Sequence, residues 1–208
     1  MNRPRSRRTL LASVATTAAV ATGGFEYSSN GSGDSALESG TVPADRYECR
    51  DVDRPEPDVP TDEDALEPRE YPSRPAETGS GEESTDRPSS LVRGANQFVT
   101  EFERAYRQNA FLERYGSVAQ TFELRRTDAR RAAIGSAGNP DAVLVAIIYN
   151  VTTETQYATT GARDEWDVRV TYYVDENVVL RARYGGIADE PVFDPDPRTQ
   201  GVLVACFE

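Results

Sequence analysis

The chain has 208 residues, a formal net charge of −12 and no histidine, and all of its 23 basic residues are arginines. Without histidine or lysine, Ser-His-Asp and Cys-His catalysis, imidazole metal sites and Schiff-base chemistry are excluded. The acidic balance argues against nucleic acid or an anionic membrane surface as the main partner. We therefore expect no catalytic residue, no cofactor and no metal, and we favour a protein that is not an enzyme.

The N-terminus carries a basic pair followed by a mildly apolar run. Arg7 and Arg8 precede residues 10–21, which are rich in alanine, leucine and threonine. Residues 1–24 resemble a twin-arginine signal peptide, and the apolar run is too short to span a bilayer. We expect an extracellular or cell-surface protein exported by the twin-arginine route, with no transmembrane segment after cleavage. Retention of the leader as an anchor stays open.

The acidic residues are concentrated before the C-terminal domain. Residues 34–88 contain 17 acidic residues and six arginines (net −11), whereas residues 89–208 contain 17 and 13 (net −4). High net charge of one sign repels itself, and molar salt removes much of that repulsion by shortening the screening length to about 3 Å. This composition resembles that of exported proteins from salt-loving archaea, so we expect a halophilic protein.

Residues 25–88 are rich in proline, glycine, serine and carboxylates and poor in large apolar side chains. Such a segment buries too little surface to offset its ordering entropy, and we expect a disordered acidic arm that acts as a tether or wraps the domain. Cys49 lies in this arm, and the only other cysteine is Cys206. In an oxidising compartment the pair predicts a disulfide, because no histidine is present to activate a free thiol.

Residues 89–208 form the predicted folded domain, which begins with a helix. Apolar residues recur at helical spacing from Leu91 to Leu112, and Gly116 is placed to end the helix. On this pattern, Glu103 and Arg107 fall on the polar face as an i,i+4 ion pair.

After this helix the apolar period changes to that of strands. Residues 143–151 are apolar on both faces, and residues 166–174 alternate with a core face that includes Trp166. A three-residue turn at 175–177, with Asn177 in the left-handed conformation, predicts that Val174 pairs with Val178. A short last strand covers 202–207. The fold class is α+β, with one long N-terminal helix packed on a curved antiparallel sheet of four to five strands.

This element order resembles the cystatin-like and NTF2-like folds. The helix string FERAYRQNAFLERYG and the leader together resemble small exported haloarchaeal proteins of unassigned function. The likeness implies a curved sheet wrapped around the helix and implies no activity.

Three arginines and one asparagine are candidate ligand-binding residues. Arg169, Arg181 and Arg183 share the polar face of the predicted hairpin, where Arg169 would lie opposite Arg183. Opposed like charges require a negative partner, which is either an anionic glycan or sulfate or a neighbouring carboxylate such as Asp167. Asn109 falls in the apolar stripe of the helix, where its amide would form a pocket floor or bind a neighbouring loop.

Two further patterns have a structural and a functional interpretation. The acidic residues at 189, 190, 194 and 196 would be a solvated loop or a Ca²⁺ site, although their spacing is not that of an EF-hand. Asn30 and Asn150 each begin an N-glycosylation acceptor pattern.

Two functions remain open on these observations. The first is a non-enzymatic interaction module, at the cell surface or outside the cell, for an unknown protein or envelope partner. The second is a small-molecule or glycan binding protein, or a carboxylate-based enzyme, with a pocket under the sheet lined by Tyr149, Trp166 and Tyr172.

Overall fold

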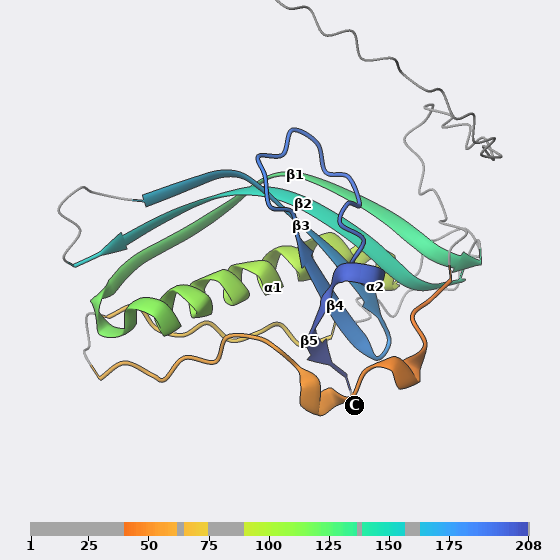
Figure 1. The fold of residues 1–208 in the computed structure, drawn as a ribbon, viewed down its shortest axis with the longest axis horizontal. Coiled ribbons are helices and arrows are strands. Elements are labelled where there is room, and N and C mark those ends of the chain that lie inside the picture. Colours follow the sequence, from red (N-terminus) through yellow and green to blue (C-terminus); the bar gives the residue numbers. More distant parts are fainter. Residues whose placement is uncertain (1–39, 62–64, 75–89, 137–138, 157–162, 208) are drawn as a thin grey trace, which may run out of the picture. The chain divides into compact units, whose positions relative to one another are not determined.

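A computed structural model describes residues 40–61, 65–74, 90–136, 139–156 and 163–207. One long helix, α1 (Ser90–Tyr115), lies against one face of a five-stranded antiparallel sheet that arches over it (Figure 1). The strands follow one another in the sheet in sequence order. They are β1 (Ala119–Ser136), β2 (Asn139–Thr155), β3 (Arg163–Asp175), β4 (Val178–Arg183) and β5 (Val202–Cys206). The predicted α+β class, with its single long N-terminal helix, is confirmed.

Helix α1 runs for 26 residues because its apolar side chains recur every three or four positions. Ala95, Val99 and Phe102 on the buried face are each at most 1 % exposed. The helix ends at Tyr115, and Gly116 follows with a φ of +55°, a conformation that glycine adopts without a Cβ clash. A short 3₁₀ turn, η3 (Gly116–Val118), then leads into β1. The predicted end of the helix at Gly116 is thus confirmed.

The centre of the sheet is buried on both faces, which explains the continuous apolar run in β2. The main core lies between α1 and the sheet. On the opposite face, Tyr173, Leu180 and Leu203 pack with Val42 from the arm and Phe193 from the segment after β4. That segment includes the short helix α2 (Pro197–Gln200).

The described parts of the acidic arm wrap around the domain, so that α1 lies between the sheet and the arm (Figure 1). The arm contains two 3₁₀ turns, η1 (Ala44–Arg46) and η2 (Cys49–Asp51). Its backbone bonds to the domain, since the Asp53 N–H donates to the Leu203 carbonyl at 2.8 Å. The Tyr71 ring lies 4.9 Å from that of Phe102.

The expectation of a disordered arm therefore does not hold for residues 40–61 and 65–74. Most of its described large apolar side chains, among them Val42 and Tyr71, pack in or against the core, whereas Val59 is exposed. The predicted disulfide between Cys49 and Cys206 is confirmed, with Cα atoms 5.4 Å apart. This bond reduces the entropy that ordering the arm would otherwise cost.

Candidate functional site

The turn between β3 and β4 has two residues, Glu176 and Asn177, and not the three that were predicted, because β3 continues to Asp175 and β4 begins at Val178. Val174 therefore pairs with Val179 and not with Val178. The Asp175 carboxylate holds this turn by accepting the backbone N–H groups of Asn177 and Val178, both at 2.7 Å. Asn177 is not in the left-handed conformation that we predicted. Side chains alternate along a strand, so a shift of one residue moves every β4 side chain to the other face of the sheet.

This register places two of the candidate arginines under the sheet, facing α1. Arg181 pairs with Tyr172 and Arg183 with Val170, and both partners belong to the main core face. Arg169 lies on the opposite face of the sheet. The predictions that the three arginines share one polar face, and that Arg169 opposes Arg183, are wrong for this reason.

Arg181 meets a glutamate from the helix in the interior. Its Nε and Nη2 atoms each donate to a carboxylate oxygen of Glu103 at 2.8 Å. The hydroxyls of Tyr149 and Tyr172 donate to the same carboxylate, each at 2.5 Å. The Tyr106 ring covers the guanidinium, with its centre 4.1 Å from the Cζ atom of Arg181. We call these five residues the Glu103 cluster. Glu103 is fully buried, so its predicted place on the polar face of the helix is wrong.

Burial and charge oppose each other at the Glu103 cluster. Burial would by itself raise the pKa of Glu103, but the charge and hydrogen bonds of Arg181 and the tyrosine hydroxyls outweigh it and hold that pKa below its usual value. Burial, followed by the nearby Glu103 charge, raises the pKa of Tyr172 well above its usual value and that of Tyr149 in the same direction. The cluster therefore contains a carboxylate, a guanidinium and neutral phenols at neutral pH.

The Glu103 cluster is closed as a chemical centre. Each carboxylate oxygen of Glu103 accepts two hydrogen bonds, one from Arg181 and one from a tyrosine. No lone pair is left facing solvent, and a saturated carboxylate of lowered pKa is a poor general base. The cluster joins α1 to β2, β3 and β4 and so fixes the helix on the sheet.

A β-bulge in β3 determines which side chains before Val168 face α1. Tyr149 pairs with Val168 but Val151 pairs with Glu165, so β3 has one extra residue at this point. Asp167 takes a φ of 52°, and its N–H donates to the side-chain oxygen of Asn150 at 2.9 Å. The extra residue reverses, from this point on, which side chains of β3 face the helix and which face away from it. Glu165 consequently lies on the helix side.

Trp166 is 61 % exposed as a result of this bulge. The strict alternation over residues 166–174 predicted Trp166 on the core face, and that prediction is wrong. Tyr149 and Tyr172, the other two residues predicted to line a pocket, are fully buried in the Glu103 cluster. None of the three lines the cleft described next.

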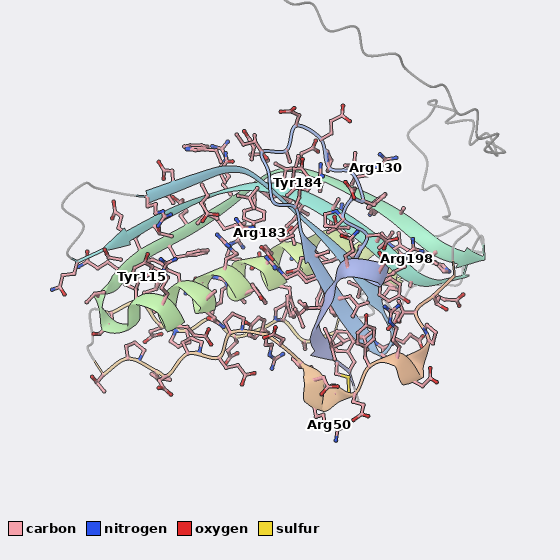
Figure 2. All side chains as sticks on the ribbon, in the orientation of Figure 1. Arg50, Tyr115, Arg130, Arg183, Tyr184 and Arg198 are labelled. Carbon is pink, nitrogen blue, oxygen red and sulfur yellow. A yellow bond between two sulfur atoms is a disulfide. The ribbon has the colours of Figure 1, made fainter. Side chains whose placement is uncertain are left out.

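A cleft of about 230 Å³ opens beside the Glu103 cluster, between the C-terminal half of α1 and the ends of four strands. Figure 2 labels two of its lining residues, Tyr115 from the end of α1 and Arg183 from the end of β4. We call it the arginine cleft. It is lined by Arg107, Ala110, Phe111, Arg114, Tyr115, Phe122, Val151, Thr153, Arg163, Glu165 and Arg183.

Four guanidinium groups line the arginine cleft beside a single carboxylate. Glu165 Oε2 accepts from Arg107 at 2.6 Å and from Arg183 at 3.1 Å. Among the described residues, neither Arg114 nor Arg163 has a carboxylate within ion-pair distance. The lining side chains therefore carry a formal charge of +3, four positive and one negative. This is a local excess of positive charge in a chain of net charge −12.

The two ends of the arginine cleft differ in character. Phe111 on α1 lies with its ring centre 4.9 Å from that of Tyr115 and 6.3 Å from that of Phe122 on β1. The arginines of the sheet come from the other side, from β3 and β4. Since the strands are arranged in sequence order, the cleft has an aromatic end at β1, where Arg114 also lies over the Tyr115 ring, and a second end at β3 and β4 that is lined by charged side chains alone.

Two of the predicted binding residues lie outside the arginine cleft. Asn109 is buried and binds the arm, since its side-chain oxygen accepts from the Arg69 N–H at 2.9 Å and its amide donates to the Arg69 carbonyl at 3.0 Å. This is the loop contact rather than the pocket floor. Arg169 donates to the carbonyls of Glu190 and Asp194 at 3.2 and 2.7 Å, and so holds the segment after β4 against the sheet.

The acidic loop has structural contacts in the described part of the chain. The Asp196 carboxylate accepts the backbone N–H of Arg198 at the start of α2 and pairs with the guanidinium of that residue at 2.6 Å. Within the described ranges, no three carboxylate or cysteine side chains are grouped so that they could hold a metal ion. No helix among them is both long and apolar enough to cross a membrane.

Three predicted residues, Arg7, Arg8 and Asn30, lie outside the described residues. Asn150 is described and half-buried, and its side-chain oxygen is used in the bulge. Sequence reasoning missed Glu103, Glu165 and the C-terminal face of α1 as site residues.

Comparisons with known proteins gave no match. No protein-family model, curated protein or solved structure matches this chain. The function is therefore inferred from the contacts within the molecule.

Proposed function

We propose that the protein is an exported, non-enzymatic binding module that works outside the cell in high salt and holds a small anionic ligand in the arginine cleft. The observation that carries this proposal is the set of four guanidiniums around one carboxylate, two of them without an ion-pair partner among the described residues. Guanidiniums present several donors in a planar arrangement that suits carboxylate, sulfate and phosphate groups.

The state of the carboxylates supports a binding role over catalysis. Glu103 has no free lone pair, and Glu165 accepts from two guanidiniums through one oxygen. Histidine and lysine are absent from the sequence. Few groups near the cleft could therefore exchange a proton with a ligand near neutral pH.

The arrangement of helix and sheet is consistent with the proposed likeness to cystatin-like and NTF2-like folds. In this proposal the curved sheet forms a cone over α1, with the Glu103 cluster closing its interior and the arginine cleft as its mouth. Ligand sites are commonly concave, with apolar walls and a few placed polar groups, and the arginine cleft has this composition.

Export and high salt are the second part of the proposal. The leader with Arg7 and Arg8, the absence of lysine and the acidic composition support it. Changing both residues to lysine keeps the charge but removes the guanidinium pair that a twin-arginine receptor reads. We expect the Arg7→Lys/Arg8→Lys protein to accumulate in the cytoplasm in cell fractionation, and undiminished export would contradict the route.

Ligand binding is tested on protein recovered from its own medium by native mass spectrometry. We expect a small anion bound to the wild type and lost from the Arg183→Gln variant. Arg125→Gln is the matched control, since Arg125 is an exposed arginine of β1 outside the cleft. A stoichiometric protein in place of a small anion would instead favour an interaction module for a protein or envelope partner.

A further inference from the structure

We propose that the arginine cleft selects a ring-bearing carboxylate, with the ring at the β1 end and the carboxylate at the β3–β4 end. This inference rests on the proposed function and narrows it to one class of ligand. It follows from the size of the cleft, its polarity across the sheet and the unequal screening of its two kinds of contact.

Size limits the ligand to about one ring. The cleft volume of about 230 Å³ is below the range of typical drug-sized sites, so the cleft encloses a small acid and not a whole oligosaccharide or nucleotide. A single six-membered ring with one acid group is of the right size.

The polarity of the cleft gives the ligand a direction. Phe122, Thr153 and Arg163 lie side by side on β1, β2 and β3, because Phe122 pairs with Thr153 and Thr153 pairs with Arg163. A ligand lying across these strands therefore contacts an aromatic ring at one end and a guanidinium at the other. Arg183 on β4 extends the charged end, and Phe111 on α1 extends the aromatic end.

High salt makes the ring necessary for affinity. At molar salt the screening length is about 3 Å, so an anion held only by partly exposed arginines loses most of its electrostatic attraction. Contact between a ring and Phe111, Tyr115 and Phe122 is not screened in this way. A ligand that combines both contacts keeps its affinity under conditions in which sulfate or acetate does not.

The test is a set of isothermal titrations of the full mature chain at one fixed molar KCl concentration. The probes are benzoate, acetate, sulfate and benzamide. We expect benzoate to bind about tenfold or more tightly than each of the others, because it alone combines a ring with a carboxylate. Tyr115→Ala should reduce benzoate affinity severalfold, and Arg125→Gln should leave it unchanged. Melting curves of each variant establish that it is folded.

The outcomes separate this inference from the function on which it rests. Equal affinity for benzoate and acetate, or for benzoate and sulfate, would overturn the ring requirement while leaving an anion site in place. Equal affinity for benzamide, or no binding of any anion, would overturn both this inference and the proposed anion-binding function.

Discussion

Glu103 and Arg181 are 78 positions apart in the sequence and form a two-bond ion pair whose side chains are 0 % and 8 % exposed. Two tyrosine hydroxyls complete the coordination of the carboxylate. Removing two charges from water costs free energy, which is recovered only when geometry and hydrogen bonding are complete. The four elements that supply this cluster are therefore constrained to one arrangement.

Breaking this pair from one side should be costly. Glu103→Gln leaves the Arg181 guanidinium buried without a counter-charge, and we expect the free energy of unfolding to fall by about 3–5 kcal/mol. Chemical denaturation followed by circular dichroism measures it. The Glu103→Leu/Arg181→Met double variant removes both charges. Its loss of unfolding free energy should be smaller than the sum of the losses in the single variants Glu103→Leu and Arg181→Met. Additive losses would show that the two side chains do not interact.

Acid should weaken the protein partly through Glu103. The folded pKa of this carboxyl lies below its unfolded value, so its contribution is present above the unfolded pKa and is lost as the pH falls through the folded one. We expect the unfolding free energy to decline below about pH 4.5, with a shallower slope in Glu103→Gln. Glu101→Gln is the control: the pKa of Glu101 is also lowered, but its side chain is 36 % exposed and its effect is reduced by solvent. An identical acid slope in wild type and Glu103→Gln would contradict this assignment.

The sequence predicted the elements of the fold better than their faces. The period of apolar residues along α1 and the glycine after it were sufficient to place the helix, because amphipathic periodicity is a local property. Glu103 was misplaced because a charged residue is normally solvated, although Val99 and Tyr106, four before and three after it, mark the buried stripe. Its partner Arg181 lies on β4, 78 positions away, and local periodicity carries no information about a pairing between such distant residues.

The candidate site depended on two shifts of one residue that a sequence pattern does not specify. The Asp175 side chain holds a shorter turn, and the bulge at Asp167 is fixed by Asn150 from the neighbouring strand. Each shift exchanges the two faces of a strand. The first turned Arg181 and Arg183 toward α1, and the second replaced Trp166 with Glu165 in the cleft.

Salt should stabilise the mature protein if the halophilic proposal is right. Without residues 1–24, which contain four arginines and no acid, the formal charge is −16. Self-repulsion of this charge is screened as salt rises, so the melting temperature should increase from low to molar KCl. Differential scanning fluorimetry measures it. A flat or falling curve would count against a protein adapted to high salt.

The disulfide should stabilise the arm more than it determines the fold. Cys49 and Cys206 close a loop of 157 residues, for which chain-entropy arithmetic gives about 5 kcal/mol as an upper figure. We expect the Cys49→Ser/Cys206→Ser protein to unfold at lower denaturant while its helix and sheet remain formed. The contacts of α1 with the sheet, and the Glu103 cluster with them, do not pass through Cys49.

Hydrogen exchange distinguishes the arm from the core in that variant. Asp53 lies four residues after Cys49, and its N–H donates to the Leu203 carbonyl. This N–H should lose protection from hydrogen exchange. The amides of β2 should keep theirs in the same sample. Loss of protection throughout the sheet would mean that the arm is required for the core to form. Two titratable thiols in the exported wild-type protein would refute the bond itself.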